Sequence, residues 1–66
     1  MTKYYDLHVF YSRNYGFSVP LAIDTDESLD DNKIINYAIE QNKIDEDDVN
    51  QIDYIMEIDE EEFLMM

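Results

Sequence analysis

The side chains with catalytic potential in this sequence are a single histidine and many carboxylates, and cysteine is absent. A serine–histidine pairing would need Ser12 or Ser18 next to His8, on a strained turn that exposes the nucleophile, and the sequence shows no such turn. The absence of cysteine excludes disulfides, thiolate metal sites and cysteine nucleophiles. We therefore expect His8 to occupy an ordinary strand position and the protein not to be an enzyme.

One group of carboxylates begins like a calcium-binding loop. Asp24–Asp30 has acids at its first and third positions, but the sixth position is Leu29, where such loops need glycine, and the twelfth is Ile35, where they need glutamate. The sequence also lacks a glycine-rich phosphate loop. We expect no cofactor and no dedicated metal site, while an ion-dependent structural or regulatory role stays open as a third interpretation.

Composition places the chain among small folded proteins with a strong negative charge. It has 66 residues, 17 Asp and Glu against 4 Lys and Arg, and a net charge of −13. With 45% hydrophobic and 14% aromatic residues it differs from disordered chains. Its length allows one domain, residues 1–66. No apolar run reaches the ~20 residues that span a bilayer, and no signal pattern is present. We expect a soluble, cytoplasmic protein without membrane contact, and so few basic residues disfavour direct binding to nucleic acid.

Alternating apolar residues predict a β-hairpin over about residues 4–23. Its turn is expected at residues 13–16, because Asn14 and Gly16 tolerate a positive φ. Pro20 cannot donate to a β-ladder, so the second strand should lie at an edge of the sheet. The residues expected to point inward are Tyr5, Leu7, Val9, Tyr11, Phe17, Val19, Leu21 and Ile23.

The middle of the chain predicts a helix over about residues 30–43. Ser28 or Asp30 is expected to cap its start, and Ile44 is expected to fold back onto the core. The apolar side chains of the helix recur at helical spacing. They are Ile34, Ile35, Ala38 and Ile39.

The last part of the chain predicts a third strand over about residues 51–59. Residues 60–66 either extend this strand or form an acidic and apolar tail. The expected inward face of the strand carries Ile52, Tyr54, Met56 and Ile58, and the opposite face carries Gln51, Asp53, Ile55 and Glu57.

These elements predict a single small α+β domain of the order β-β-α-β. A right-handed crossover through the helix gives a three-stranded antiparallel sheet of order 2-1-3, with the helix packed on one face. The other face would stay partly bare, and an aromatic patch of that kind often marks a partner surface. The residues expected there are Tyr4, His8, Phe10, Ala22 and Ile55.

The distribution of the acids suggests a partner. Every acid except Asp6 follows residue 23. Alternate residues on one strand face lie ~6.6–6.8 Å apart, about twice the ~3.4 Å step between phosphates of one DNA strand. Asp53 and Glu57 share a face, and Asp59 and Glu61 would continue the row if the strand persists. We therefore expect this surface to occupy a Lys- and Arg-lined cleft on a nucleic-acid-binding protein.

The residues expected to bind this partner are the later acids and one aromatic anchor. Tyr15, on the hairpin turn, is expected to be exposed and to serve as that anchor. Tyr54 is a second candidate anchor, but its position in the alternation favours the core. The predicted set is Asp45, Glu46, Asp47, Asp48, Asp53, Glu57, Asp59, Glu60, Glu61 and Tyr15.

In size, charge, absence of cysteine and order of elements, the whole chain resembles the small acidic anti-defence proteins of phages and mobile elements. These include anti-CRISPR and anti-restriction inhibitors that imitate DNA. The resemblance implies a non-enzymatic inhibitor of a host defence nuclease, either a CRISPR effector or a restriction enzyme, acting in the cytoplasm of the host cell. For a CRISPR effector it implies covering the basic residues that read the PAM.

An alternative interpretation uses the acids for solubility only. The protein would then be a small protein–protein interaction module that binds through the exposed sheet face or an open edge. Phe63–Met66 could insert into a partner or into a second copy, because methionine adapts well to interfaces. A homodimer therefore stays open as well.

Overall fold

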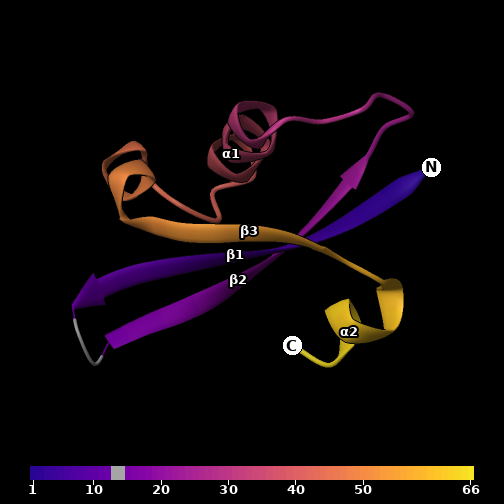
Figure 1. The fold of residues 1–66 in the computed structure, drawn as a ribbon. Coiled ribbons are helices and arrows are strands. Elements are labelled where there is room, and N and C mark those ends of the chain that lie inside the picture. The colour runs from indigo at the N-terminus through magenta and orange to yellow at the C-terminus, as the bar shows by residue number, and fades with distance from the viewer. Residues whose placement is uncertain (13–14) are drawn as a thin grey trace.

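The computed structural model describes residues 1–12 and 15–66. The described residues form three strands, two α-helices and a short 3-10 helix that lies between the first α-helix and the third strand (Figure 1). Arg13 and Asn14, on which the turn was predicted, lie outside the described residues. The elements are β1 (Thr2–Ser12), β2 (Tyr15–Asp24), α1 (Asp31–Glu40), the 3-10 helix η1 (Glu46–Gln51), β3 (Ile52–Ile58) and α2 (Glu60–Leu64).

The strands form one antiparallel sheet of order β2-β1-β3, with α1 on one of its faces (Figure 1). This confirms the α+β fold and strand order predicted from the sequence. The most apolar strand, β1, is central, and Pro20 lies on the edge strand β2, where its missing N–H leaves no ladder bond unmade. No helix in the described ranges is both long and apolar enough to cross a membrane.

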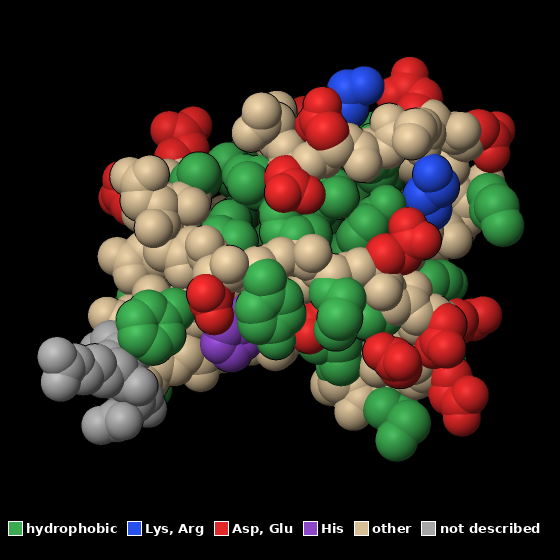
Figure 2. Space-filling model, viewed as in Figure 1, with side chains coloured by type: hydrophobic (Ala, Val, Ile, Leu, Met, Phe, Trp, Pro, Cys, Tyr) green, Lys and Arg blue, Asp and Glu red, His purple; other side chains and the backbone are tan. Residues whose placement is uncertain are grey.

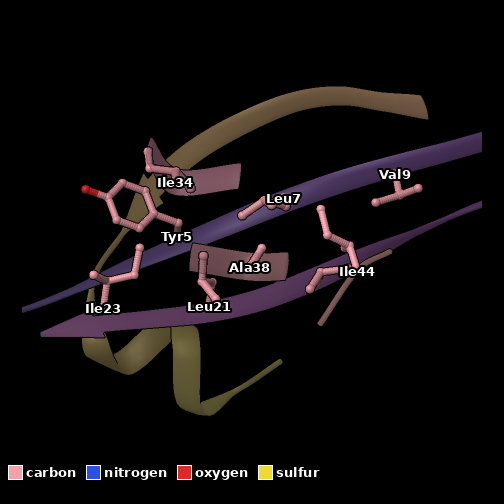
Figure 3. Packing of buried hydrophobic residues seen from close by; sticks show 9 residues of the cluster. Tyr5, Leu7, Val9, Leu21, Ile23, Ile34, Ala38 and Ile44 are labelled. Carbon is pink, nitrogen blue, oxygen red and sulfur yellow. The ribbon is translucent and has the colours of Figure 1, made fainter. Parts of the chain in front are cut away.

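The core lies between α1 and the facing side of β1 and β2 (Figure 3). Ile44 is buried there, as predicted, and closes the core beyond the end of α1. Burying each aliphatic side chain of this kind contributes ~1.5–3 kcal/mol. The buried set is Tyr5, Leu7, Val9, Val19, Leu21, Ile23, Ile34, Ala38 and Ile44.

Two residues predicted to be inward, Tyr11 and Phe17, are 42% and 38% exposed. They lie on the inner face but near the hairpin end, beyond the reach of α1 (Figure 1). A helix of ten residues is about 15 Å long, whereas an eleven-residue strand is about 36 Å long. The helix therefore covers less than half of the hairpin, and alternation alone cannot show where this cover ends.

Gly16 is part of β2 and pairs with Phe10, whereas the sequence predicted it in the turn. Its φ is not positive, so conformational freedom does not explain it. A Cβ at this position would lie 2.9 Å from the Val9 carbonyl oxygen and 3.1 Å from Nε2 of His8. Glycine is needed here because the neighbouring strand and the His8 ring approach closely.

Gly16→Ala should therefore lower the free energy of unfolding by about 1–2 kcal/mol, as overpacking does. The new methyl group meets a backbone oxygen, and the two strands must shift to admit it. Urea denaturation followed by circular dichroism measures the change. Ser18→Ala, an exposed position in the same strand, should stay within about 0.5 kcal/mol of the parent. A stability gain for Gly16→Ala would show that the hairpin has room for the methyl group.

Helix α1 begins and ends on identifiable side chains. Of the two predicted caps the structure selects Asp30, whose carboxylate accepts the N–H of Lys33 at 2.8 Å. The helix ends at Glu40, three residues before the predicted end. Asn42 has a φ of 59°, and its N–H and that of Lys43 donate to the carbonyls of Ile39 and Ala38. The left-handed conformation of Asn42 ends the helix and turns the chain so that Ile44 reaches the core.

Asn42→Ala should cost about 1 kcal/mol of stability, because a side chain with Cβ is strained in the left-handed region and alanine lacks the local hydrogen bonding of asparagine. Asn42→Gly should leave stability equal or slightly higher, because glycine adopts this conformation freely. Thermal unfolding of the two variants checks the pair. Equal losses in both would mean that the asparagine side chain, rather than the backbone conformation, stabilises the stop.

The orientation of β3 differs from the prediction. Ile55 pairs with Leu7, and Met56 pairs with Asp6. Paired residues of an antiparallel sheet share a face, so Ile55 points to the core side. The expected inward position of Tyr54, Met56 and Ile58 is therefore wrong, as is the expected position of Ile55 on the bare face.

An irregularity in the β1–β3 pairing explains this orientation. Tyr54 pairs with His8 but Ile52 pairs with Val9, which leaves Asp53 as an extra residue. A bulge of this kind inserts one residue into a strand. It allows Ile52 and Ile55, three positions apart, both to pack against the core. Strict alternation would bury only one of them.

The chain after β3 forms a second helix, where the sequence left a strand extension or a tail open. The strand ends at Ile58, and the Asp59 carboxylate accepts the N–H of Glu62 at 2.8 Å to cap α2. The ring of Phe63 lies 4.9 Å from that of Tyr4 on the sheet face opposite α1. The row through Asp59 and Glu61 was expected only if the strand persisted, and because the strand ends at Ile58 these two acids do not continue it.

Candidate functional site: an acidic edge

The predicted acids lie on β3 and on the segments that precede and follow it in the chain, and we call this set the acidic edge. Strand β3 is terminal in the sheet, so among the described residues no strand pairs with its outer side. η1 directly precedes it and α2 directly follows it, at opposite ends (Figure 1). Seven strand residues span about 20 Å. The acidic edge consists of Asp45, Glu46, Asp47, Asp48, Asp53, Glu57, Asp59, Glu60 and Glu61.

The first group of acids is held by η1 against the hairpin. The two carboxylate oxygens of Asp48 accept the Tyr11 hydroxyl at 3.0 Å and the Asp45 N–H at 3.1 Å. Partial desolvation raises the pKa of Tyr11, and its bond to Asp48 raises it further. Asp48 therefore serves the fold, whereas Glu46 and Asp47 are exposed and form no ion pair within the described residues.

The middle of the acidic edge carries Asp53 and Glu57, both exposed. Asp53 is the extra residue of the bulge, and Glu57 pairs with Tyr5 on the core side of the sheet. Burial raises the pKa of Tyr5, and the nearby charge of Glu57 adds to this. The acids are therefore unevenly spaced, and the regular row at twice the phosphate step is not formed.

The last group follows β3 directly. One carboxylate oxygen of Asp59 accepts the hydrogen bond that caps α2, while Glu60 and Glu61 are exposed in the first turn of this helix. Acids at this end of a helix are favoured by its dipole, so the helix tolerates their mutual repulsion. Figure 2 shows acidic side chains gathered at this end of the molecule.

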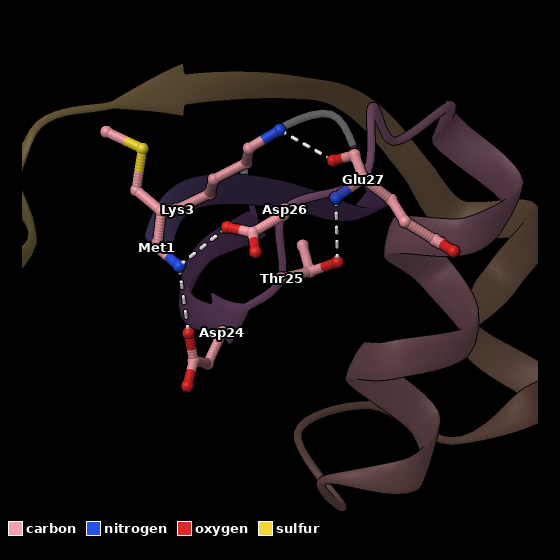
Figure 4. A network of polar contacts seen from close by, with 6 residues as sticks. All are labelled: Met1, Lys3, Asp24, Thr25, Asp26 and Glu27. Atoms are coloured by element: carbon pink, nitrogen blue, oxygen red, sulfur yellow. Dashed lines mark hydrogen bonds and ion pairs between the residues drawn. The ribbon is translucent and has the colours of Figure 1, made fainter.

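The charge of the acidic edge is not neutralised within the described part of the chain. Ion pairs within residues 1–12 and 15–66 join the Met1 ammonium to Asp24 at 3.3 Å and to Asp26 at 3.0 Å (Figure 4). Hydrogen bonds from Asp26 and then Asp24 raise the pKa of this amino group. Lys3 donates to the carbonyl oxygen of Glu27 at 2.6 Å, which is not a carboxylate contact. The field of the acidic edge therefore extends into solvent.

Tyr15, the predicted anchor, is 64% exposed near the tip of the hairpin. Its ring lies 6.0 Å from that of Tyr11, which in turn lies 5.4 Å from Phe17. The sequence predicted that Tyr15 is exposed, but it placed Tyr11 and Phe17 in the core. The short length of the helix is the signal that could have shown that Tyr11 and Phe17 are not covered. Because Tyr11 bonds to Asp48, this aromatic group adjoins one end of the acidic edge.

Tyr54 was assigned to the core but is 45% exposed. Its ring is stacked on His8, with centroids 5.0 Å apart and planes 4° from parallel. It lies on the sheet face opposite α1, and therefore on a different surface from the Tyr15 group. His8 occupies a strand position, as expected.

Within residues 1–12 and 15–66, no three His, Asp or Glu side chains converge in a way that could hold a metal ion. Comparisons with protein-family models, with curated proteins and with solved structures gave no significant match.

Proposed function

We propose that this protein is a non-enzymatic inhibitor that places its acidic edge in the basic nucleic-acid-binding cleft of a nuclease. The observation that carries the proposal is a free sheet edge about 20 Å long, flanked by two acidic helices. Within the described residues its carboxylates form no ion pair. Surface charge of one sign at this density destabilises the free protein through self-repulsion. Binding to a partner of opposite charge would explain why this charge is present.

The acidic edge matches a cleft by its charge and length. Twenty ångströms correspond to about six phosphate steps of one DNA strand. The uneven spacing of the carboxylates favours mimicry of the overall field rather than a phosphate-by-phosphate copy. Lysine and arginine side chains in such a cleft repel one another, and an acidic ligand relieves that repulsion. Opposite potentials also steer the two proteins together quickly at low salt.

Tyr15 and its neighbours add an apolar anchor at one end of the acidic edge. Binding energy in interfaces concentrates in a few aromatic and arginine residues, while rim charges contribute mainly to rate and orientation. The exposed rings of Tyr11, Tyr15 and Phe17 meet that description. In this proposal the acids bring the partner to the edge and the aromatic group holds it.

The proposed target is a defence nuclease of the host cell, and the proposed location is the host cytoplasm. A CRISPR effector fits because it holds its nucleic acids in a positively charged channel and reads the PAM with arginine side chains. A restriction enzyme offers a comparable cleft. In both, the inhibitor would compete with DNA and would need no chemistry of its own.

The test begins with the immobilised protein and a host lysate freed of nucleic acid, at low and at high salt. Proteins that bind only at low salt are identified by mass, and each recovered nuclease is assayed for DNA cleavage with added inhibitor. Salt-sensitive capture of a nuclease whose cleavage then falls supports the proposal. Recovery of no basic nucleic-acid-binding enzyme, or unchanged cleavage by the one recovered, refutes it.

A further inference from the structure

The sheet face opposite α1, which we call the open face, is a second surface without a cover over most of its length. Its exposed side chains are largely apolar, with Phe10, Tyr54 and Met56 at 43%, 45% and 49% exposure. Phe63 of α2 packs at one end only, against Tyr4. Figure 2 shows hydrophobic side chains beside the single histidine on this side of the sheet. An apolar area of this kind on a strongly charged molecule indicates a contact surface.

Two polar atoms in the middle of the open face have no hydrogen-bond partner among the described residues. Oδ1 of Asp6 and Nδ1 of His8 are both inaccessible to solvent and unbonded. Asp6 lies between Pro20 and Met56, whose side chains have no donor to offer. Lys3, the nearest lysine or arginine in the sequence, is bonded to the Glu27 carbonyl oxygen. Asp6 is only partly buried, but its Oδ1 is covered without a hydrogen bond within the described residues, and an unpaired covered oxygen costs stability.

The missing partner of Asp6 must be a donor, because an ionised carboxylate only accepts hydrogen bonds. A cation is favoured further by the net charge of −13. Arginine suits the surroundings best, since its planar guanidinium can donate to a carboxylate while it lies against an aromatic ring. Met56, opposite Asp6 and half exposed, is flexible enough to move aside for it.

A second copy of this chain is a poor occupant. It would bring another −13 charge and a second unpartnered Asp6 to the same interface. We propose that the open face instead receives an apolar segment of a partner protein, with an arginine that bonds to Asp6 between the side chains of Tyr54 and Met56. This inference goes beyond the proposed function, because it uses a different surface and does not require a nucleic-acid cleft.

The experiment uses a capped peptide, Val-Leu-Arg-Leu-Val, as probe, titrated into the isotope-labelled protein and followed by NMR. We expect shifts confined to the open face. A matched peptide with neutral citrulline in place of arginine should bind about tenfold more weakly or worse. Asp6→Asn should cause a similar loss. Glu40→Gln, which removes the same charge from α1 on the other side of the sheet, should leave the affinity within about twofold.

Equal binding of the two peptides, equal effects of Asp6→Asn and Glu40→Gln, or no shifts on the open face would each overturn the proposal. Asp6→Leu gives a second readout that needs no ligand. It should raise the melting temperature of the free protein, because the unpartnered carboxylate is removed from an apolar face. A lower melting temperature would show that Asp6 serves the fold and would remove the basis of the argument. Neither result depends on inhibition of a nuclease.

Discussion

Reversing three charges on the acidic edge should abolish inhibition of the target nuclease and leave the fold intact. The variant replaces Asp47, Asp53 and Glu57 by lysine. All three side chains are exposed, and none makes a side-chain hydrogen bond or ion pair within the described residues. Steered association depends on charge by factors of 10–10³, so we expect affinity to fall by about 100-fold or more. Inhibition curves on the recovered nuclease and circular dichroism of the free variant measure both parts.

A matched variant separates position from net charge. Glu27, Asp31 and Glu40 are also exposed, but they lie on α1 and the loop before it. Their replacement by lysine changes the net charge equally and should weaken inhibition far less. Equal losses in the two variants would mean that the partner senses total charge only. Full inhibition by the edge variant would show that the acidic edge is not the binding surface.

Leu7→Ala should unfold most of the protein at room temperature or bring it close to unfolding. Leu7 is completely buried in the central strand, and such truncations cost ~2–5 kcal/mol. A chain of this length has a total stability of roughly 3–10 kcal/mol, because stability is about 0.05–0.15 kcal/mol per residue. Urea titration followed by circular dichroism measures the loss.

Leu64→Ala provides the control for this truncation. Leu64 is 71% exposed on α2, so the same chemical change should alter stability by less than about 0.5 kcal/mol. A small loss at Leu7 together with a large loss at Leu64 would place the core on the wrong face of the sheet. Comparable moderate losses at both would mean that α2 is a packed part of the core.

The hairpin, the helix and their order could be predicted because their signals are local. The alternation around Leu7 and Leu21 selects one face of each strand, and Pro20 restricts its strand to an edge. The cap at Asp30 lies within one turn of the residues it serves. The acids of the edge could also be chosen from the sequence, because β3 and its flanking segments are adjacent along the chain. The distances between these acids in the folded protein could not be predicted from the sequence.

What could not be predicted depends on contacts between distant residues. The facing of β3 is set by a bulge at Asp53, and the bulge is favoured because Ile52 and Ile55 both gain core contacts. A strict period of two cannot represent it. Tyr11 and Phe17 have the alternation of core residues, yet α1 is too short to reach them. That Oδ1 of Asp6 and Nδ1 of His8 have no partner among the described residues is visible only once the neighbouring strands are in place.

Binding at the acidic edge and binding at the open face should respond differently to salt, whether one partner or two are involved. Charge on the edge should control the salt dependence and the rate of association. Asp6, in contrast, lies among apolar side chains, where a paired charge is screened little by salt. Variants of the edge should therefore change the response to salt, while Asp6→Asn should change affinity at every salt concentration.

The most direct measurement is displacement of a labelled DNA duplex from the target nuclease by this protein, across a series of salt concentrations. We expect simple competition, with the apparent affinity of the inhibitor falling by about tenfold or more between about 50 and 200 mM salt. An affinity that does not change with salt, or a complex that holds nuclease, DNA and inhibitor together, would contradict the account.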